Sequence, residues 1–350
     1  MANASDTQHP AARPDRRRPT ISDVAALTGL SKATVSRALN DRDRVSAATR
    51  ARVLATLEEI GYLRSHAAAS LSTGRTGLLG LVIGANRNPT VLSAMHGALS
   101  AAGDYDVAVY VSETDERHDT IYGRLLASRA VDGVVHLFPR VADEPFVRSL
   151  QRRGVPVVVV EPQAPFAEVS TVWPDSFHDG YLCTAHLLEG GHSRVAICGD
   201  VPGWGRERRY VEGYRRALAD ASVLVDPELV AEVGWTHEVG YQATARWLAL
   251  DDPPTAACYC CDTAAFGAVA CARDRGLRLP EELAIVGYDD TEVAGWVAPA
   301  LTTLRDRRTM LVAEAFTILT AVLAGEISAP VEREVRSELA IRESSATHRG

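Results

Sequence analysis

The sequence lacks the features that would place it in a membrane or in an oxidising compartment. No uncharged apolar run of about 18 residues or more occurs, so we expect no membrane-spanning helix. The first residues, MANASDTQHP, lack the apolar segment of a secretory signal. All six cysteines lie from Cys183 onward, three of them within CYCC, which is not the spacing of a disulfide framework. These absences predict a cytoplasmic protein with reduced thiols.

Signatures of catalysis and of metal binding are also missing. The chain contains no G-x-S-x-G, no H-E-x-x-H, no Walker loop and no G-x-G-x-x-G after a strand. On a strand, Cys258 and Cys260 would face one side and Cys261 the other, so the three thiols could not chelate one metal ion. His192 falls at a helix-to-strand turn, where a structural role is favoured over that of a base. We therefore expect no enzyme, no bound metal and no cofactor.

Charge is divided unevenly along the chain. The formal net charge is −8, yet residues 1–75 hold 12 Lys and Arg against 7 Asp and Glu. The remaining residues hold 25 Lys and Arg against 38 Asp and Glu. This asymmetry predicts a basic module that can approach phosphates, attached to an acidic body that phosphates would repel. A basic tail without a function is the alternative.

The stretch TISDVAALTGLSKATVSRALND, residues 20–41, has the pattern of two short helices around Gly29, where a left-handed residue can end the first helix. Val24, Ala25 and Leu27 form the expected inner face of that helix. Ser31 can cap the second helix and Ser46 a third. Two helices packed at a tight turn form a helix-turn-helix unit, although a simple helical hairpin would have the same pattern.

If this unit binds DNA, the second helix presents its exposed side chains to the major groove. Lys32 and Arg37 can donate to guanine, and Ala33 lies on the same face. Ser31, Thr34 and Ser36 suit contacts with phosphates or bases.

From residue 78 onward, short apolar strands alternate with helices. Such a pattern predicts βαβ units and buried parallel sheet, arranged either as two small doubly wound sheets or as one barrel. Val172, Trp173 and Pro174 interrupt the alternation, and we interpret them as a crossover between two lobes. The expected strands are residues 78–83, 106–112, 131–137, 155–161, 193–199, 229–235, 255–261 and 283–289.

The N-terminal stretch and the following VSAATRARVLATLEEIGY closely resemble the head of the lactose/galactose repressor family of bacterial transcription regulators. Further motifs occur in family order: HLLEGGHSRVAICGD, EGYRRAL, and the segment from CCDTAAFG through GYDDTEVAG to LTTLR. The resemblance implies a small all-α helix-turn-helix head and an α/β core of two doubly wound parallel-sheet lobes, similar to periplasmic sugar-binding proteins.

The resemblance also implies domain boundaries. We expect a disordered tail over residues 1–18, the head over 19–63 and a hinge helix with linker over 64–75. The effector-binding core should span residues 76–345. Its N-lobe would comprise about 76–173 and 303–326, and its C-lobe about 175–300 and 330–345.

Individual residues match family positions. Leu71 matches the leucine that enters the minor groove from the hinge helix, although Ala69 stands where the family has arginine. Trp235 matches the aromatic residue that stacks on the effector, and Asp289 matches the effector-binding carboxylate. Cys261 replaces a family asparagine, and Tyr210 replaces a family arginine, which leaves the neighbouring Arg209 to supply that charge. The predicted effector-binding residues are Asp175, Arg209, Trp235, Asp262 and Asp289.

For Asp262, capping of the helix that it starts is the alternative to effector binding. Several carboxylates and an indole at one site suit a polyhydroxylated ligand such as a sugar. The sequence thus predicts a homodimeric repressor that binds a near-palindromic operator under the control of a small-molecule effector, with no membrane partner. A cytoplasmic solute-binding protein without a regulatory role is the second hypothesis.

Overall fold

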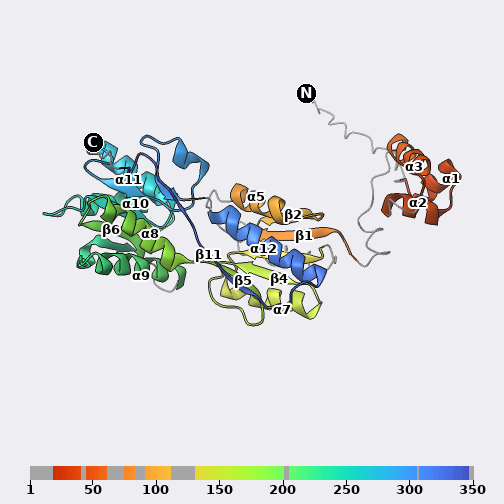
Figure 1. Ribbon diagram of the computed structural model, residues 1–350, viewed down its shortest axis with the longest axis horizontal. Coiled ribbons are helices and arrows are strands. Elements are labelled where there is room, and N and C mark those ends of the chain that lie inside the picture. Colours follow the sequence, from red (N-terminus) through yellow and green to blue (C-terminus); the bar gives the residue numbers. More distant parts are fainter. Residues whose placement is uncertain are drawn as a thin grey trace, which may run out of the picture. The chain divides into compact units, whose positions relative to one another are not determined.

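The computed structural model describes residues 19–40, 45–60, 75–83, 91–111, 131–200, 205–232, 234–305 and 307–346. The chain divides into two compact units, residues 1–74 and 75–350, and each is described by itself below (Figure 1). The predicted tail and all but the last residue of the predicted hinge, including Leu71, lie outside the described residues.

In its described residues, the smaller unit, the head, has three short helices around an apolar centre. Val24, Val35 and Val53, one from each helix, are fully buried. Gly29 ends the first helix with a φ of 65°, as predicted. Leu27, expected on the inner face, is 64% exposed, because the inner face continues instead through Thr28, which is buried. The helices are α1 (Ile21–Thr28), α2 (Lys32–Asn40) and α3 (Ala47–Glu59).

The larger unit contains a six-stranded sheet in which every neighbouring pair is parallel. β1 lies between β2 and β3, so the winding direction reverses between β1 and β3. Ligands of open α/β sheets bind beyond the carboxyl ends of the strands near such a reversal. In sheet order the strands are β11 (Glu332–Val335), β5 (Ser170–Pro174), β4 (Val157–Val160), β3 (Gly133–Leu137), β1 (Leu78–Ile83) and β2 (Asp106–Val111).

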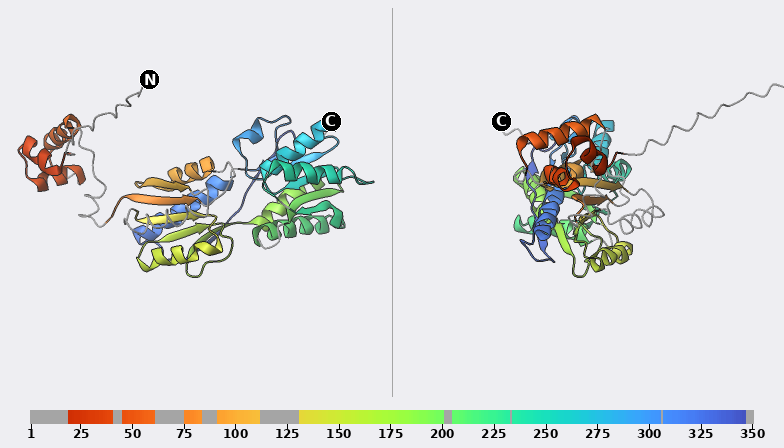
Figure 2. Two further views of the ribbon diagram at one scale, coloured as in Figure 1. Left: turned by 180° about the vertical axis from the view of Figure 1, so that it is seen from behind. Right: turned by 90° about the vertical axis from the view of Figure 1, so that its right-hand side faces the viewer.

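Helices cover both faces of this sheet. On one face, α5 (Val91–Ala101) and α12 (Arg307–Ala324) lie side by side, and their apolar side chains share a core with Leu81 and Val158 (Figures 1 and 2). On the other face, α7 (Glu144–Arg152) packs on the alternate strand positions. Buried apolar strands with helices on both sides are the doubly wound arrangement that the sequence predicts.

The second sheet has four parallel strands and repeats the same winding, with β6 between β7 and β8. Helices α8 (Ser176–Glu189) and α9 (Gly205–Asp220) cover one face, and α10 (His237–Trp247) and α11 (Asp262–Asp274) cover the other. The strands are β7 (Val230–Glu232), β6 (Val195–Asp200), β8 (Ala256–Tyr259) and β9 (Ala284–Val286).

The chain returns to the first sheet near its end, and this return changes one prediction. Residues 172–174, interpreted as a crossover, belong to β5, which pairs with β11 more than 150 residues later along the chain. A short antiparallel pair, β10 (Thr303–Leu304) and β12 (Leu339–Ala340), lies beside the return. Two doubly wound sheets rather than a barrel are therefore present, which confirms the predicted fold class. The described residues also form short 3-10 helices, η2 (Val141–Asp143), η3 (Pro227–Leu229) and η4 (Glu292–Gly295).

Candidate functional site

The second helix of the head, α2, separates buried from exposed residues along its length. The Ser31 hydroxyl accepts a hydrogen bond from the Thr34 N–H at 3.1 Å, which caps the start of the helix as predicted. Val35 and Ala38 are buried against α1 and α3. Lys32, Ala33 and Arg37 are all exposed. The helix thus presents a basic face outward and an apolar face to the head.

The polar residues of α2 have different surroundings. The Ser31 hydroxyl lies 2.9 Å from the Thr34 hydroxyl, and Thr34 and Ser36 are half-buried. The Arg37 Nε donates to the Ala33 carbonyl one turn earlier at 3.2 Å, so this side chain lies along its own helix. These positions are compatible with the predicted DNA contacts, which themselves stay predictions.

Contacts with α3 stabilise the turn before α2. The Arg52 guanidinium donates to the Thr28 carbonyl at 2.5 Å, at the end of α1. Thr20 at the other end of α1 donates from its N–H and its hydroxyl to Asp23, each at 2.7 Å. The start of α1 is therefore capped, and its end is held to α3 by Arg52.

In the larger unit, the predicted effector residues fall into separate groups at the carboxyl ends of strands. Asp175 follows β5 and caps α8 by accepting from the His178 N–H at 3.1 Å. Its carboxylate also accepts from Arg336 at 3.1 Å and lies 3.9 Å from Arg209. Arg209 makes its short contact, 2.6 Å, with Glu334. Asp175 and Arg209 are thus brought together, in a group that includes Arg336 and Glu334.

Asp289 belongs to a different group, which the sequence did not predict. The Arg308 guanidinium donates to Asp289 Oδ1 at 3.3 Å and to Glu161 Oε2 at 2.8 Å. All three side chains are almost fully buried. The guanidinium also lies over the Phe138 ring, 4.4 Å from its centroid. In the sequence, Glu161 follows the apolar run VVVV and so could have been recognised as a polar residue at a strand end. Arg308 belongs to the charged run RDRR, which does not indicate a buried side chain.

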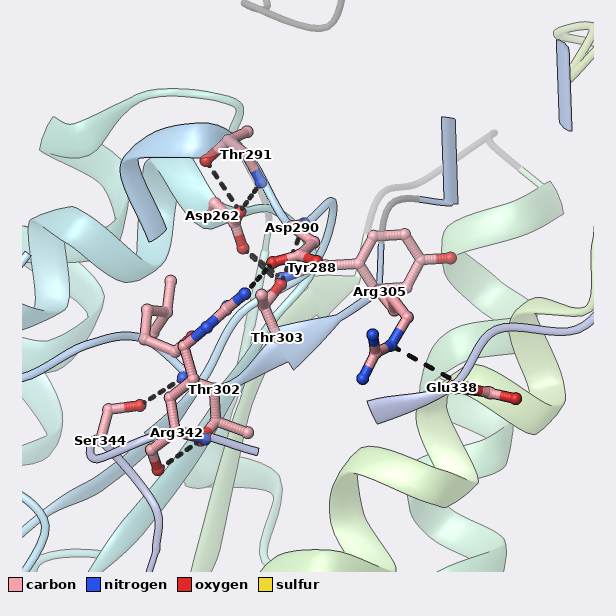
Figure 3. Close-up of polar contacts among 11 residues, drawn as sticks. Asp262, Tyr288, Asp290, Thr291, Thr302, Thr303, Arg305, Glu338, Arg342 and Ser344 are labelled. Carbon is pink, nitrogen blue, oxygen red and sulfur yellow. Dashed lines mark hydrogen bonds and ion pairs between the residues drawn. The ribbon is translucent and has the colours of Figure 1, made fainter. Parts of the chain in front are cut away.

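Both carboxylate oxygens of Asp262 accept hydrogen bonds from neighbouring residues of the protein (Figure 3). Its carboxylate accepts from the Tyr288 N–H, the Thr303 hydroxyl, and both the N–H and the hydroxyl of Thr291, at 2.6 to 2.9 Å. Burial, and then the charge of Asp289, raise the pKa of Asp262 to about 7. Asp262 therefore fixes the loop that carries Asp289.

The capping alternative for Asp262 is wrong. The residue that caps α11 is Cys261, whose Sγ accepts from the Ala264 N–H at 3.4 Å. Asp262 is the first residue of the helix, and its side chain turns to the neighbouring loop instead. No room exists for a side chain at Gly287, because an added Cβ would lie 2.5 Å from Asp262 Oδ1. The loop and the carboxylate are thus in direct contact.

Trp235 stands apart from these groups along the second sheet. It follows β7, whereas Asp289 follows β9, and these are the first and last strands of the four. Three strand spacings separate them, which is about 14 Å. The indole is 38% exposed. The contact of Trp235 with an effector stays a prediction.

Residues that could hold a metal ion or cross a membrane were also sought. Within the described ranges, no group of three or more His, Cys, Asp or Glu side chains is arranged to bind a metal ion. No helix in those ranges combines the length and the apolar character that a bilayer requires. The six cysteines form no disulfide and are buried, with Cys258 and Cys260 on one face of the second sheet and Cys261 on the other, as predicted.

Comparison with known proteins matches both units. Residues 20–65 fit the family model for bacterial regulatory proteins of the lacI family, and residues 184–345 fit that for the periplasmic binding protein-like domain. The chain is 32% identical to the HTH-type transcriptional regulator CelR of Thermobifida fusca, over 94% of this chain and 99% of the relative. It is 30% identical to the HTH-type transcriptional repressor PurR of Haemophilus influenzae, over 86% of this chain and 90% of the relative.

Solved structures give the same result. A complex of the transcriptional regulator CelR with cellobiose matches with a TM-score of 0.68 and 30% identity, covering 93% of this chain and 100% of that one. A lac repressor dimer bound to operator and an anti-inducer has the same fold, with a TM-score of 0.79 and 24% identity over 95% of this chain and 100% of that one. These relatives are transcriptional regulators rather than enzymes. The chain belongs to the lacI family of bacterial regulatory proteins and is a DNA-binding transcriptional regulator.

Proposed function

We propose that this chain is a homodimeric repressor whose affinity for a near-palindromic operator is set by an uncharged polyhydroxylated effector. The observation that carries the DNA-binding half is the exposed basic face of α2, with Lys32, Ala33 and Arg37 outward and Val35 buried. An arginine or lysine donor on such a face fits the acceptors of guanine in the major groove. The solute-binding alternative leaves this head without a use.

The proposed roles follow the position of each residue. Lys32, Ala33 and Arg37 read bases, while Ser31, Thr34 and Ser36 contact the DNA backbone. Two copies related by a two-fold axis would place two such helices on the two half-sites of the operator. Leu71, which lies outside the described residues, is proposed as the minor-groove wedge of the hinge. The domain and lobe boundaries given above complete this proposal.

The effector is proposed to bind at the carboxyl ends of the strands in the larger unit. Asp289 and Asp175 follow strand ends, Arg209 of α9 lies 3.9 Å from Asp175, and Trp235 offers an exposed indole to the flat face of a sugar ring. Asp262 supports the Asp289 loop from behind and has no role in direct contact. The complex of a relative with cellobiose supports a carbohydrate.

Effector and operator must influence each other equally. An effector that weakens operator binding by some factor is itself bound more weakly by that factor in the DNA complex. The proposed route runs from the strand ends to the linker before residue 76. That linker enters β1 beside Asp132, whose carboxylate accepts from the Thr76 N–H at 2.7 Å and the Gly77 N–H at 2.9 Å.

Selection from a random double-stranded DNA library tests the proposal. The full chain is expected to enrich one near-palindromic sequence, and fluorescence anisotropy then measures its affinity with and without cellobiose and related sugars. Enrichment of a sequence without two-fold symmetry would contradict the dimer arrangement. Enrichment of no sequence at all would contradict the reading role of α2.

A further inference from the structure

One guanidinium joins the two sheets of the larger unit. Arg308 is the second residue of α12, a helix whose apolar side chains pack on the six-stranded sheet. Its Nη1 donates to Glu161, the residue directly after β4 of that sheet, at 2.8 Å. Its Nη2 donates to Asp289, which follows β9 of the four-stranded sheet, at 3.3 Å. The side chains of Arg308, Glu161 and Asp289 are only 3 to 4% exposed, so water does not screen these contacts.

The backbone is bent to bring the partners of Arg308 together. Phe138, Glu161 and Asp289 all have positive φ, at 57°, 48° and 119°. Among the described residues, only three other non-glycine positions have positive φ: Glu168, Ser222 and Asp290. Residues with side chains avoid this region, and such strain persists at ligand clamps and switch regions, where the surroundings fix it. Three strained positions around one guanidinium indicate a site rather than ordinary packing.

A second set of contacts holds the loop of Asp289 on its far side. Asp262 accepts from the Tyr288 and Thr291 backbone N–H groups, which flank Asp289 and Asp290. The Arg342 guanidinium donates to Asp290 Oδ1 at 2.6 Å (Figure 3). The loop is therefore fixed from one side by Asp262 and Arg342, and Arg308 fixes the direction in which Asp289 points.

The charge of this group restricts what can join it. Two carboxylates and one guanidinium meet at this point, so acidic side chains outnumber the basic one among the three. Asp262, whose pKa is near 7, adds part of a negative charge close to Asp289. A carboxylate or phosphate on an effector would bring a further negative charge into a buried site, which is costly. A hydroxyl adds no charge and donates to carboxylate oxygens, each of which can accept more than one hydrogen bond.

We propose that Arg308 is a positioning residue of the effector site: it fixes Glu161 and Asp289 across the two sheets and thereby limits effectors to uncharged polyhydroxylated molecules. This rests on the proposed function, since it takes the effector to bind at the strand ends. Arg308 itself acts through the two carboxylates, to which its Nη1 and Nη2 donate.

The first experiment needs no effector and measures the melting temperature of the full chain. Arg308→Met leaves two buried carboxylates without their cation, and we expect a fall of about 10 °C. The variant Asp289→Asn and the double variant complete a cycle, in which the two losses should be clearly less than additive. The control is Arg305→Met, three residues earlier on an exposed side chain, with an expected change below about 2 °C.

A rescue guards against a variant that does not fold. Combining Arg308→Met with Glu161→Gln and Asp289→Asn removes the unpaired charges, and at least half of the lost melting temperature should return. Additive losses in the cycle, or no recovery in the triple variant, would overturn the positioning role. Arg308→Lys keeps the positive charge but cannot donate from two nitrogens to both carboxylates as the guanidinium does, so we expect an intermediate fall in melting temperature.

The second experiment measures selectivity by calorimetry with matched probes. Glucose is compared with glucuronate and with glucose 6-phosphate, each of which keeps the pyranose ring and differs from glucose only in the acidic group at C6. The wild type should bind the neutral member at least 10-fold more tightly, and Arg308→Met should widen the ratio because the site becomes more negative. Tighter binding of an acidic member would overturn the proposal.

The two experiments separate this inference from the proposed function. If neither member of any pair binds, the proposed effector class fails, and the thermal cycle still decides the role of Arg308. If the cycle is additive while operator selection succeeds, the repressor function stands and the positioning role fails.

Discussion

Arg37 in the head and Arg308 in the larger unit carry the same guanidinium group in opposite surroundings. Arg37 is exposed, and the hydrogen bond from its Nε goes to its own helix. Arg308 is buried and donates to two carboxylates from different sheets. An arginine on the surface keeps donors for an external partner, whereas a buried one uses them to organise its own protein. Residue type alone therefore does not separate recognition from support, but burial does.

A matched pair of substitutions tests how much burial matters. Glu161→Gln removes one partner of buried Arg308, and Glu334→Gln removes the partner of half-exposed Arg209. We expect Glu161→Gln to lower the free energy of unfolding by about 3 kcal/mol, and Glu334→Gln to change it by about 0.5 kcal/mol or less. Urea unfolding of both variants measures the difference. Equal losses would show that the two clusters are alike and would remove the contrast.

Buried Asp262 should make the free energy of unfolding depend on pH. Its folded pKa of about 7 lies above the unfolded value, which is about 4. Between these values the folded protein binds more protons than the unfolded chain, so this group makes the free energy of unfolding fall as pH rises from about 4 to about 7. Asp262→Asn should remove that slope, which amounts to about 2 to 3 kcal/mol between pH 5 and pH 8.

Urea unfolding at several pH values measures this slope for the wild type and the variant. The control is Asp252→Asn, at a side chain that is 83% exposed, which should leave the slope as in the wild type. A slope that persists in Asp262→Asn would assign the titration to another group. In that case Asp262 would give the site around Asp289 no special dependence on pH.

Arg37→Ala tests the exposed side of the comparison. We expect the affinity for the selected operator to fall about 10- to 100-fold, because one major-groove contact is worth about 1 to 3 kcal/mol. The free energy of unfolding should change by less than about 0.5 kcal/mol, since the side chain is exposed. Anisotropy with the operator and with a scrambled duplex measures both affinity and sequence preference. The same substitution at exposed Arg148 in α7 is the control and should leave operator affinity unchanged.

The sequence predicted what local patterns determine and missed what distant contacts determine. The apolar runs of β1 and β4 indicated buried parallel strands, and Gly29, Ser31 and Ser46 marked the helix ends of the head. By contrast, β11 reads EREV, with three charged residues, and becomes a strand only because β5 offers it an edge.

The candidate site was predicted in the same uneven way. Asp289 was predicted because it follows a strand and matches a family position, and Asp175 because it follows the expected crossover; their contact with an effector stays a prediction. Glu161 and Arg308 are 147 residues apart, and no pattern in the sequence joins them. Asp262 was predicted to bind the effector. Only the fold shows that its carboxylate accepts hydrogen bonds from the Tyr288–Thr291 loop and from Thr303 instead.

The smallest predicted effect separates folding from DNA contact within the head. Ser31 and Ser46 cap α2 and α3 with nearly equal geometry, accepting from the N–H three residues later at 3.1 and 3.2 Å. Each hydroxyl also lies 2.9 Å from the hydroxyl of that residue, Thr34 or Thr49. Replacing either serine by alanine should lower the free energy of unfolding of the head by about 1 kcal/mol. Ser31 alone is proposed to contact the DNA backbone, so Ser31→Ala should weaken operator binding a few-fold beyond Ser46→Ala. Equal operator affinities for the two variants would leave Ser31 as a helix cap without a part in recognition.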